Sequence, residues 1–454
     1  MDWFICLLIA GTGLGLAMTR SNRAIDFVVF VFVFNRGLRR VIDYYVNHGM
    51  KPLSPISLTP LLVTGALLIP VILNIQKLPR RAAPVFYCTF LGVIYAFMVG
   101  FFRVKIAAIY ALAEALAPLA LFAYVLLLRP TTEVKNRWMR SFTWAALLAS
   151  AYGVYQYWVI PPWDAAWLIQ SKMYGYMGIP EPTKMTVFST MAERGPLASF
   201  LAFALVPMVV NRKWRALPGL LGWAGVILVG YVIVLTMSRS GVIIAAFGCV
   251  TYVFINRGKG FKQVIAGVVV LAAAALLLRD RIPNAEQVIK RFETLQNLEE
   301  DGSLKTRIAI MSYGPTQVLR DPQGFGLGAW GLATRVNTGT MENQGTVMDA
   351  GWFNIILVYG IPGTLMLAAA LVVLWRALDE RFRTPQTLDE HVYLGRALFI
   401  TVLIASLSGN VLMTFSLIWL AFGCGLVVSP LPRRLPMRPD SVPAPRPGQV
   451  RRPG

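Results

Sequence analysis

Long apolar runs, separated by short polar segments, dominate this chain. Most runs come close to the roughly 20 residues that an α-helix needs to cross the hydrocarbon core of a bilayer. The pattern predicts an all-α polytopic integral membrane protein whose transmembrane domain is 1–429. We expect 12 or 13 transmembrane helices, because the short run 24–35 is either a tilted span or a re-entrant segment. The clear spans are 3–19, 57–75, 85–102, 106–128, 141–160, 196–210, 217–236, 241–255, 263–278, 350–375, 394–408 and 411–429.

Lysine and arginine gather in the short loops, and their distribution predicts the orientation of the chain. Cytoplasmic loops of membrane proteins are enriched in these two residues. The alternation of spans puts five basic loops on one side, which we predict to be cytoplasmic, together with the C-terminus. The long loops 161–195 and 279–349 then face the periplasm, and the larger one, which we expect to contain short helices, precedes the last three spans. The basic loops are 76–84, 129–140, 211–216, 256–262 and 376–393.

Composition supports a membrane protein and argues against a nucleic-acid-binding one. Hydrophobic residues make up 56% of the chain and charged residues 14%, whereas soluble domains carry about 25% charged residues. The 43 basic residues exceed the 22 acidic ones by 21, but they lie between apolar runs and form no patch with interleaved aromatic residues. We expect the Pro/Arg-rich segment 430–454 to be a disordered cytoplasmic tail that is either solvated or attracted to anionic lipid.

Two polar positions stand out at the predicted outer ends of spans. Arg239, within Met-Ser-Arg-Ser-Gly at 237–241, lies between two apolar runs. An arginine at that depth either snorkels to the interface or binds an anion. Asp349 directly precedes the span 350–375, where it can cap the helix or act as a base.

Glu114 is the one acid well inside an apolar run. An intramembrane carboxylate is a functional candidate, and a position about 12 Å from the outer start of its span can reach an outward cavity. The alternative is a structural pair with Arg103 or Lys105.

The predicted outer loop carries a second group of motifs. Ser303 can cap a short helix that runs through Arg307 to about Leu319. The glycines that follow alternate with other residues, at 324, 326 and 328. This spacing lacks the strand and helix of a dinucleotide-binding fingerprint. It indicates instead a backbone that closely approaches a ligand or a membrane surface.

The order of these motifs resembles the O-antigen ligase and Wzy-type polysaccharide polymerase family. Ser-Arg-Ser-Gly stands between two spans. The long outer loop that follows contains Arg-Phe, Asp-Gly-Ser and Arg307, and a span with Gly-x-x-Gly then re-enters the membrane. The resemblance covers roughly 185–375, and the first 180 residues resemble the family only as a run of spans.

The resemblance implies a membrane glycosyltransferase that takes polyprenyl-diphosphate-linked oligosaccharides at the periplasmic face, with no required metal and no cofactor. The family's two arginines correspond to Arg239 and Arg307, which would hold the donor diphosphate. We expect Glu193, Arg194 and Glu114 to contribute to substrate binding. Ligases of the family carry a histidine where this chain has Asp349, which favours a polymerase and makes Asp349 the candidate base for the acceptor hydroxyl.

The few alternatives to Asp349 as a base are remote. His48 lies in the outward segment 36–56, His391 lies in a basic loop, and the other outward acids include Asp43 and Glu193. The four cysteines stand singly in apolar runs, without metal or disulfide spacing.

Three functions are therefore considered. The first is a polymerase of lipid-linked repeat units in the inner membrane, for surface or exopolysaccharide synthesis. The second is a ligase that transfers a glycan to a lipid acceptor. The third is a transporter of lipid-linked oligosaccharides, for which the chain lacks the expected internal repeat. Membrane lipids, a flippase and a chain-length regulator are the expected partners of the polymerase, and nucleic acid is not.

Overall fold

The structure is a computed structural model. It describes residues 1–50, 54–258, 260–278, 315–334, 351–383 and 389–428, together with the single residues 308, 312 and 336. Within these ranges the regular elements are all helical, and one isolated β-bridge joins Gly178 to Met185. The chain is thus an all-α membrane protein, as its sequence predicts.

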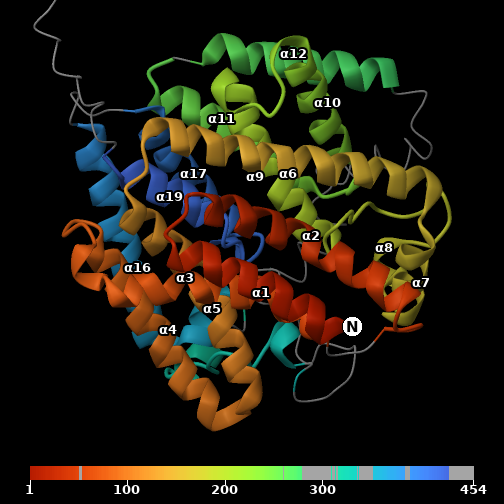
Figure 1. The fold of residues 1–454 in the computed structure, drawn as a ribbon. Helices are drawn as coiled ribbons and strands as arrows, with labels where there is room; N and C mark the ends of the chain where they lie inside the picture. The colour runs from red at the N-terminus through yellow and green to blue at the C-terminus, as the bar shows by residue number, and fades with distance from the viewer. Residues whose placement is uncertain are drawn as a thin grey trace, which may run out of the picture.

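Helices cover all the predicted spans, because a chain in lipid must pair every backbone N–H and C=O within its own segment. In Figure 1, α6 crosses the whole molecule, and α12 lies at its upper edge. The helices over the spans are α1 (Asp2–Met18), α2 (Arg23–Tyr45), α3 (Thr59–Leu73), α4 (Ala83–Val104), α5 (Ile106–Leu128), α6 (Thr132–Val159), α9 (Arg194–Val210), α10 (Gly219–Leu235), α11 (Arg239–Ile255), α12 (Phe261–Leu278), α16 (Gly351–Phe382), α17 (Glu390–Ala405), α18 (Val411–Thr414) and α19 (Ile418–Leu426).

Length and apolar character single out four of the described helices as able to cross a membrane. They are Pro55–Leu73, which joins a short 3-10 turn to α3, and the helices α4, α5 and α16. Five shorter apolar helices accompany them: Asp2–Met18, Arg194–Val210, Gly219–Leu235, Arg239–Ile255 and Phe261–Ala273. The total of 12 or 13 spans stays a prediction.

Large apolar side chains cover much of the outside of the bundle. Phe254 is 86% exposed, Leu220 83% and Phe102 77%. Exposed apolar side chains of this size and number are those expected of helices that face lipid.

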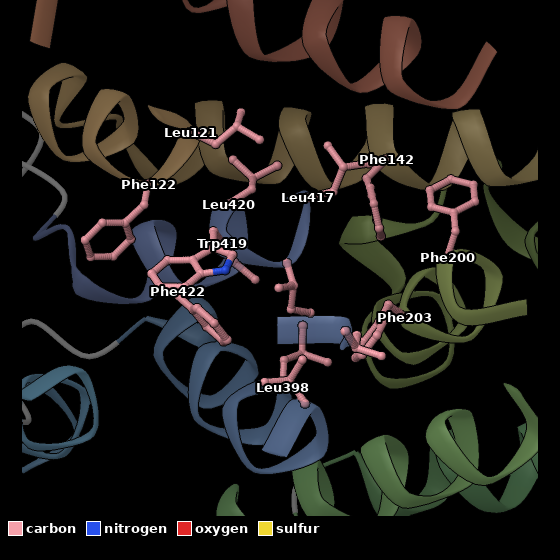
Figure 2. Close-up of a cluster of buried hydrophobic side chains, with 14 of the residues drawn as sticks. Leu121, Phe122, Phe142, Phe200, Phe203, Leu398, Leu417, Trp419, Leu420 and Phe422 are labelled. Carbon is pink, nitrogen blue, oxygen red and sulfur yellow. The ribbon is translucent and has the colours of Figure 1, made fainter. Parts of the chain in front are cut away.

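The centre of the bundle is a densely packed aromatic core (Figure 2). Phe142 of α6 meets Phe200 of α9 edge to face at 5.2 Å, and Phe122 of α5 meets Trp419 of α19 at 5.7 Å. Such edge-to-face pairs contribute about 0.5–1.5 kcal/mol each beyond the burial of their area. The core therefore ties α19 to α5, while Phe415, which lies between α18 and α19, stacks on Phe203 of α9.

Two predicted spans are interrupted, and the prediction of a continuous span over 411–429 was wrong. α18 and α19 are separate helices, and the Trp419 indole donates a hydrogen bond to the Leu412 carbonyl at 2.8 Å across the break. α16 is kinked at Gly360, where φ is 62°. Neither predicted span contains a charged residue, so mean hydropathy alone could not reveal the breaks.

The segments outside the clear predicted spans are more structured than the sequence indicated. The run 24–35 belongs to one continuous helix, α2, of 23 residues, which excludes a re-entrant segment there. The predicted loop 161–195 contains α7 (Pro162–Gln170) and α8 (Tyr174–Met177), which lie at one end of α6 (Figure 1). This segment has a small apolar cluster of its own, made of Ile160, Trp167, Leu168, Met177, Met185 and Phe188.

The five basic loops gather at one end of the bundle, which we call the basic end. Lys135 is fully buried and pairs with Asp389 at 2.8 Å, and Arg81 pairs with Glu380 at 3.1 Å. The remaining contacts join Asn211 to Glu390, His391 to Asn136 at 3.0 Å, and Gly260 to the Val210 carbonyl. The opposite end, which we call the loop end, carries the segments 161–193, 237–240 and 315–334.

Candidate functional site

Two parallel helices begin side by side at the loop end, and each begins with an arginine. Arg194 is the first residue of α9 and Arg239 the first of α11. A Cβ added to Gly241 would lie 3.0 Å from the Ala198 Cβ, so the first turns of the two helices touch. The unpaired N–H groups of a helix N-terminus carry about half a positive charge. Two arginines at adjacent helix N-termini make this region suited to an anion.

The side chains around these arginines are held in part by local contacts. The Arg194 guanidinium carbon lies 4.0 Å from the centre of the Tyr176 ring, and the residue is 9% exposed. Glu193 stands at the N-cap of α9, where its side chain makes no capping hydrogen bond. Before α11, the hydroxyl oxygens of Ser238 and Ser240 lie 2.9 Å apart. Glu193, Arg194 and Arg239 thus lie at the adjoining ends of α9 and α11.

Two of the predicted catalytic residues, Arg307 and Asp349, lie outside the described residues. The structure does describe where the chain resumes after Asp349. Gly351 packs against the backbone of Gly409, and the Trp352 N–H donates to the Ser406 carbonyl at 3.1 Å. The re-entering helix α16 therefore starts against the turn between α17 and α18.

The alternating glycines pack against helix backbone, which corrects the expectation that they approach a ligand or a membrane surface. At Gly324, Gly326 and Gly328 φ lies between 82° and 86°, in the left-handed region that favours glycine. A Cβ added to Gly326 would overlap the Gly100 backbone of α4, and one on Gly328 would lie 2.5 Å from the Ala107 backbone of α5. This part of the outer loop is wedged between α4, α5 and the kinked α16.

Hydrogen bonds fix the same segment in place. The N–H groups of Phe325 and Gly326 donate to the Leu357 and Val358 carbonyls at 2.7 and 3.0 Å. These carbonyls lose their helical partners at the Gly360 kink, so the inserted segment satisfies backbone acceptors that the kink exposes.

Glu114 has different neighbours from those proposed. Arg103 makes a bidentate ion pair with Asp321 of the predicted outer loop, at 2.6 and 3.1 Å, so it is not the partner of Glu114. The Glu114 carboxyl group instead makes a side-chain hydrogen bond with Tyr110 and interacts electrostatically with Arg36. Arg36 belongs to α2, and its approach to α5 could not be anticipated from sequence separation. Glu114 therefore stays a candidate for substrate binding.

A buried ion pair that sequence reasoning missed organises the loop end. Arg40 and Asp164 lie 2.9 Å apart, with side chains 2% and 0% exposed. Arg40 also donates to the carbonyls of Ser189 and Met191, and Asp164 accepts hydrogen bonds from Tyr152 and Gln156. The pair therefore links α2, α6 and α7 to the segment that leads into Arg194. An aspartate in Pro-Pro-Trp-Asp, at the start of a predicted loop, was the only local signal.

The two histidines lie at opposite ends. His391 is buried at the basic end beside Asn136, whereas His48 is exposed at the loop end, where its φ is 50°. In the part of the chain that the structure describes, no three His, Cys, Asp or Glu residues gather closely enough to hold a metal ion.

The family comparison bears on this region. Residues 224–368 match a family model described as O-Antigen ligase. The matched range contains Arg239, the outer loop with Arg307 and Asp349, and the kink of α16. None of the curated proteins matches the chain. The family match confirms the resemblance drawn from the motifs, and it supports the assignment of this membrane protein to an O-antigen ligase-like family.

Proposed function

We propose that this protein is a polymerase that joins lipid-diphosphate-linked oligosaccharide repeat units at the periplasmic face of the inner membrane. The family match supports glycan transfer of the ligase or polymerase type. The observation that carries the donor class is the pair of arginine-bearing helix N-termini, α9 and α11, at the loop end. Such a site suits a diphosphate, because guanidinium binds phosphate through two parallel hydrogen bonds and stays charged.

In the proposed reaction, a hydroxyl group of the acceptor sugar attacks the anomeric carbon of the donor. The new glycosidic C–O bond forms as the C–O bond to the diphosphate breaks, and polyprenyl diphosphate leaves with the bonding electrons. Asp349 takes the hydroxyl proton, a step that contributes about 10²–10⁴-fold in rate. Arg239 and Arg307 offset the negative charge that develops on the leaving group in a site walled by apolar helices. No step requires a metal ion.

A polymerase is preferred to a ligase because Asp349 stands where the ligases carry a histidine. The ligase is the second candidate, since the matching family model is described by that activity. We propose Glu193, Arg194 and Glu114 as further substrate-binding residues.

The test of this proposal is the replacement of Arg239 in cells that depend on the protein for their surface glycan. Arg239→Ala and Arg307→Ala should each abolish polymer while protein still accumulates in the membrane. Arg239→Lys should restore little, because an ammonium group does not reproduce the two-pronged contact. Arg257→Ala is the matched control, since this exposed arginine lies at the basic end. Full-length polymer from Arg239→Lys would show that charge alone suffices and would refute the diphosphate clamp.

A further inference from the structure

A cavity of about 390 Å³ opens at the loop end, between the end of α2 and α7. Its volume falls in the range of about 300–1,000 Å³ that is typical of small-molecule sites. Four aromatic residues line it, together with several polar ones. The aromatic residues are Tyr44, Tyr45, Trp163 and Trp167, and the polar ones are Arg40, Asp43, His48 and Gln170.

The aromatic walls are held in fixed positions. The rings of Tyr45 and Trp163 lie 5.9 Å apart at 49° to each other. The Trp163 indole donates to the Tyr152 hydroxyl at 2.6 Å, and Trp167 packs against Phe188 at 5.0 Å. Tyr45 is 57% exposed. A ligand therefore meets rings that are already oriented, which lowers the entropic cost of binding.

The charged groups of the lining are neutralised within the protein. Arg40 is paired with the buried carboxylate of Asp164 at 2.9 Å. Asp43 accepts from Arg39 at 3.2 Å and from the Asn47 amide at 2.9 Å. The cavity consequently favours an uncharged ligand over a phosphate.

An uncharged ligand for such a cavity needs an apolar face for the rings and hydroxyl groups for the polar rim. A pyranose has both, because its C–H faces stack on aromatic rings while its hydroxyls lie around the edge. Gln170 accepts the Met50 N–H at 2.7 Å through its carbonyl oxygen, and this orients its amide nitrogen as a donor. The exposed His48 imidazole can donate or accept on the same rim.

We propose that this cavity is a saccharide subsite that binds the neutral glycan portion of a substrate, away from its diphosphate. The inference rests on the proposed function and names a second binding site for it. Arg40 connects the two sites, since it holds the Met191 carbonyl at 2.8 Å. Three residues of chain, at most about 11 Å, then lead to Arg194. The cavity and the arginines therefore lie within the length of one oligosaccharide.

The test is direct binding of a phosphate-free glycan to the full-length protein in nanodiscs. The probe is the set of oligosaccharides of one to four repeat units that mild acid releases from the surface glycan of the protein's own strain. Calorimetry should show saturable binding to the wild type and about tenfold weaker binding to Tyr45→Ala, which loses one stacking wall. Tyr45→Phe keeps the ring and should bind within about threefold of the wild type.

Two controls separate this proposal from the proposed function. Tyr87→Ala removes a tyrosine of similar exposure at the start of α4, near the basic end, and should bind the oligosaccharides as the wild type does. Arg239→Ala should also bind them normally, because they lack the diphosphate, although it makes no polymer.

Absence of binding to the wild type, or undiminished binding to Tyr45→Ala, would overturn the saccharide subsite whatever Arg239→Ala does to polymer. Normal polymer from Arg239→Ala would refute the diphosphate clamp but would not affect the saccharide subsite. If Tyr45→Ala loses polymer while the wild type binds no oligosaccharide, the cavity is a contact site for another protein, and the proposal is again overturned.

Discussion

The buried pair of Arg40 and Asp164 makes a strong prediction about stability. Asp164→Asn keeps the size of the side chain but removes the negative charge that faces the Arg40 guanidinium at 2.9 Å. With both side chains almost fully buried, the arginine is left as an uncompensated charge. Breaking a buried pair in this way costs about 3–5 kcal/mol.

The expected loss can be checked by unfolding the purified protein with SDS in mixed micelles and following tryptophan fluorescence. Asp164→Asn should lower the free energy of unfolding by about 3–5 kcal/mol. Glu181→Gln is the matched control in the same outer segment, because Glu181 and its partner Lys184 are 53% and 60% exposed. It should change the free energy by no more than about 0.5 kcal/mol.

A double-mutant cycle with Arg40→Met isolates the pair. The sum of the unfolding free energies lost in the two single variants should exceed the loss in the double variant by about 0.5–3 kcal/mol. The reason is that removal of either partner already removes the interaction. If Asp164→Asn behaves like Glu181→Gln, or if the losses simply add, the pair does not hold the loop end together and the reasoning is refuted.

Three further predictions concern the outer loop, the base and the topology. Gly326→Ala should accelerate tryptic cleavage after Arg320 far more than Gly331→Ala does. Both glycines lie at positive φ, but only at Gly326 would a Cβ overlap neighbouring backbone. Equal cleavage rates would contradict the packing of this segment between α4, α5 and α16. Asp349→Asn should lose most polymer at normal protein levels, whereas a capping role would tolerate Asn, and a wild-type glycan ladder would demote Asp349 to a cap. Cysteines introduced one at a time at Glu181 and Lys213 should label oppositely with an impermeant maleimide in intact cells, and equal labelling would refute the orientation. The background carries Cys88→Ser, since the other three native cysteines are buried.

The helices could be predicted from sequence because apolar runs of this length have few other stable forms in lipid. The course of α2 beyond residue 35 could not be predicted, because the polar residues there resemble those of a loop. Arg39 and Arg40 remain helical because they find partners in Ser57 and Asp164, which are remote in sequence. The break between α18 and α19 was missed because only Thr414 and Ser416 mark it, and two hydroxyl residues without a charge are common inside a span.

The candidate site was predictable only where a motif marks a helix end. Arg239 lies between two apolar runs, and the structure accordingly finds it at the first turn of α11. The closeness of the helix ends that carry Arg194 and Arg239 depends on the packing of α9 against α11, which no local pattern encodes. The glycine run was recognised as a close approach of backbone, but its neighbours on α4, α5 and α16 follow from the tertiary fold alone.

The central claim, that this protein polymerises lipid-diphosphate-linked glycan units through an arginine clamp, is tested most directly by reconstitution. Purified protein in nanodiscs is given only the polyprenyl-diphosphate-linked repeat unit, and its products are separated by length. The account predicts a ladder of two or more repeat units from the wild type, with at least about a hundredfold less from Arg239→Ala. No product until a separate lipid acceptor is added would identify a ligase, and an unchanged ladder from Arg239→Ala would contradict the clamp.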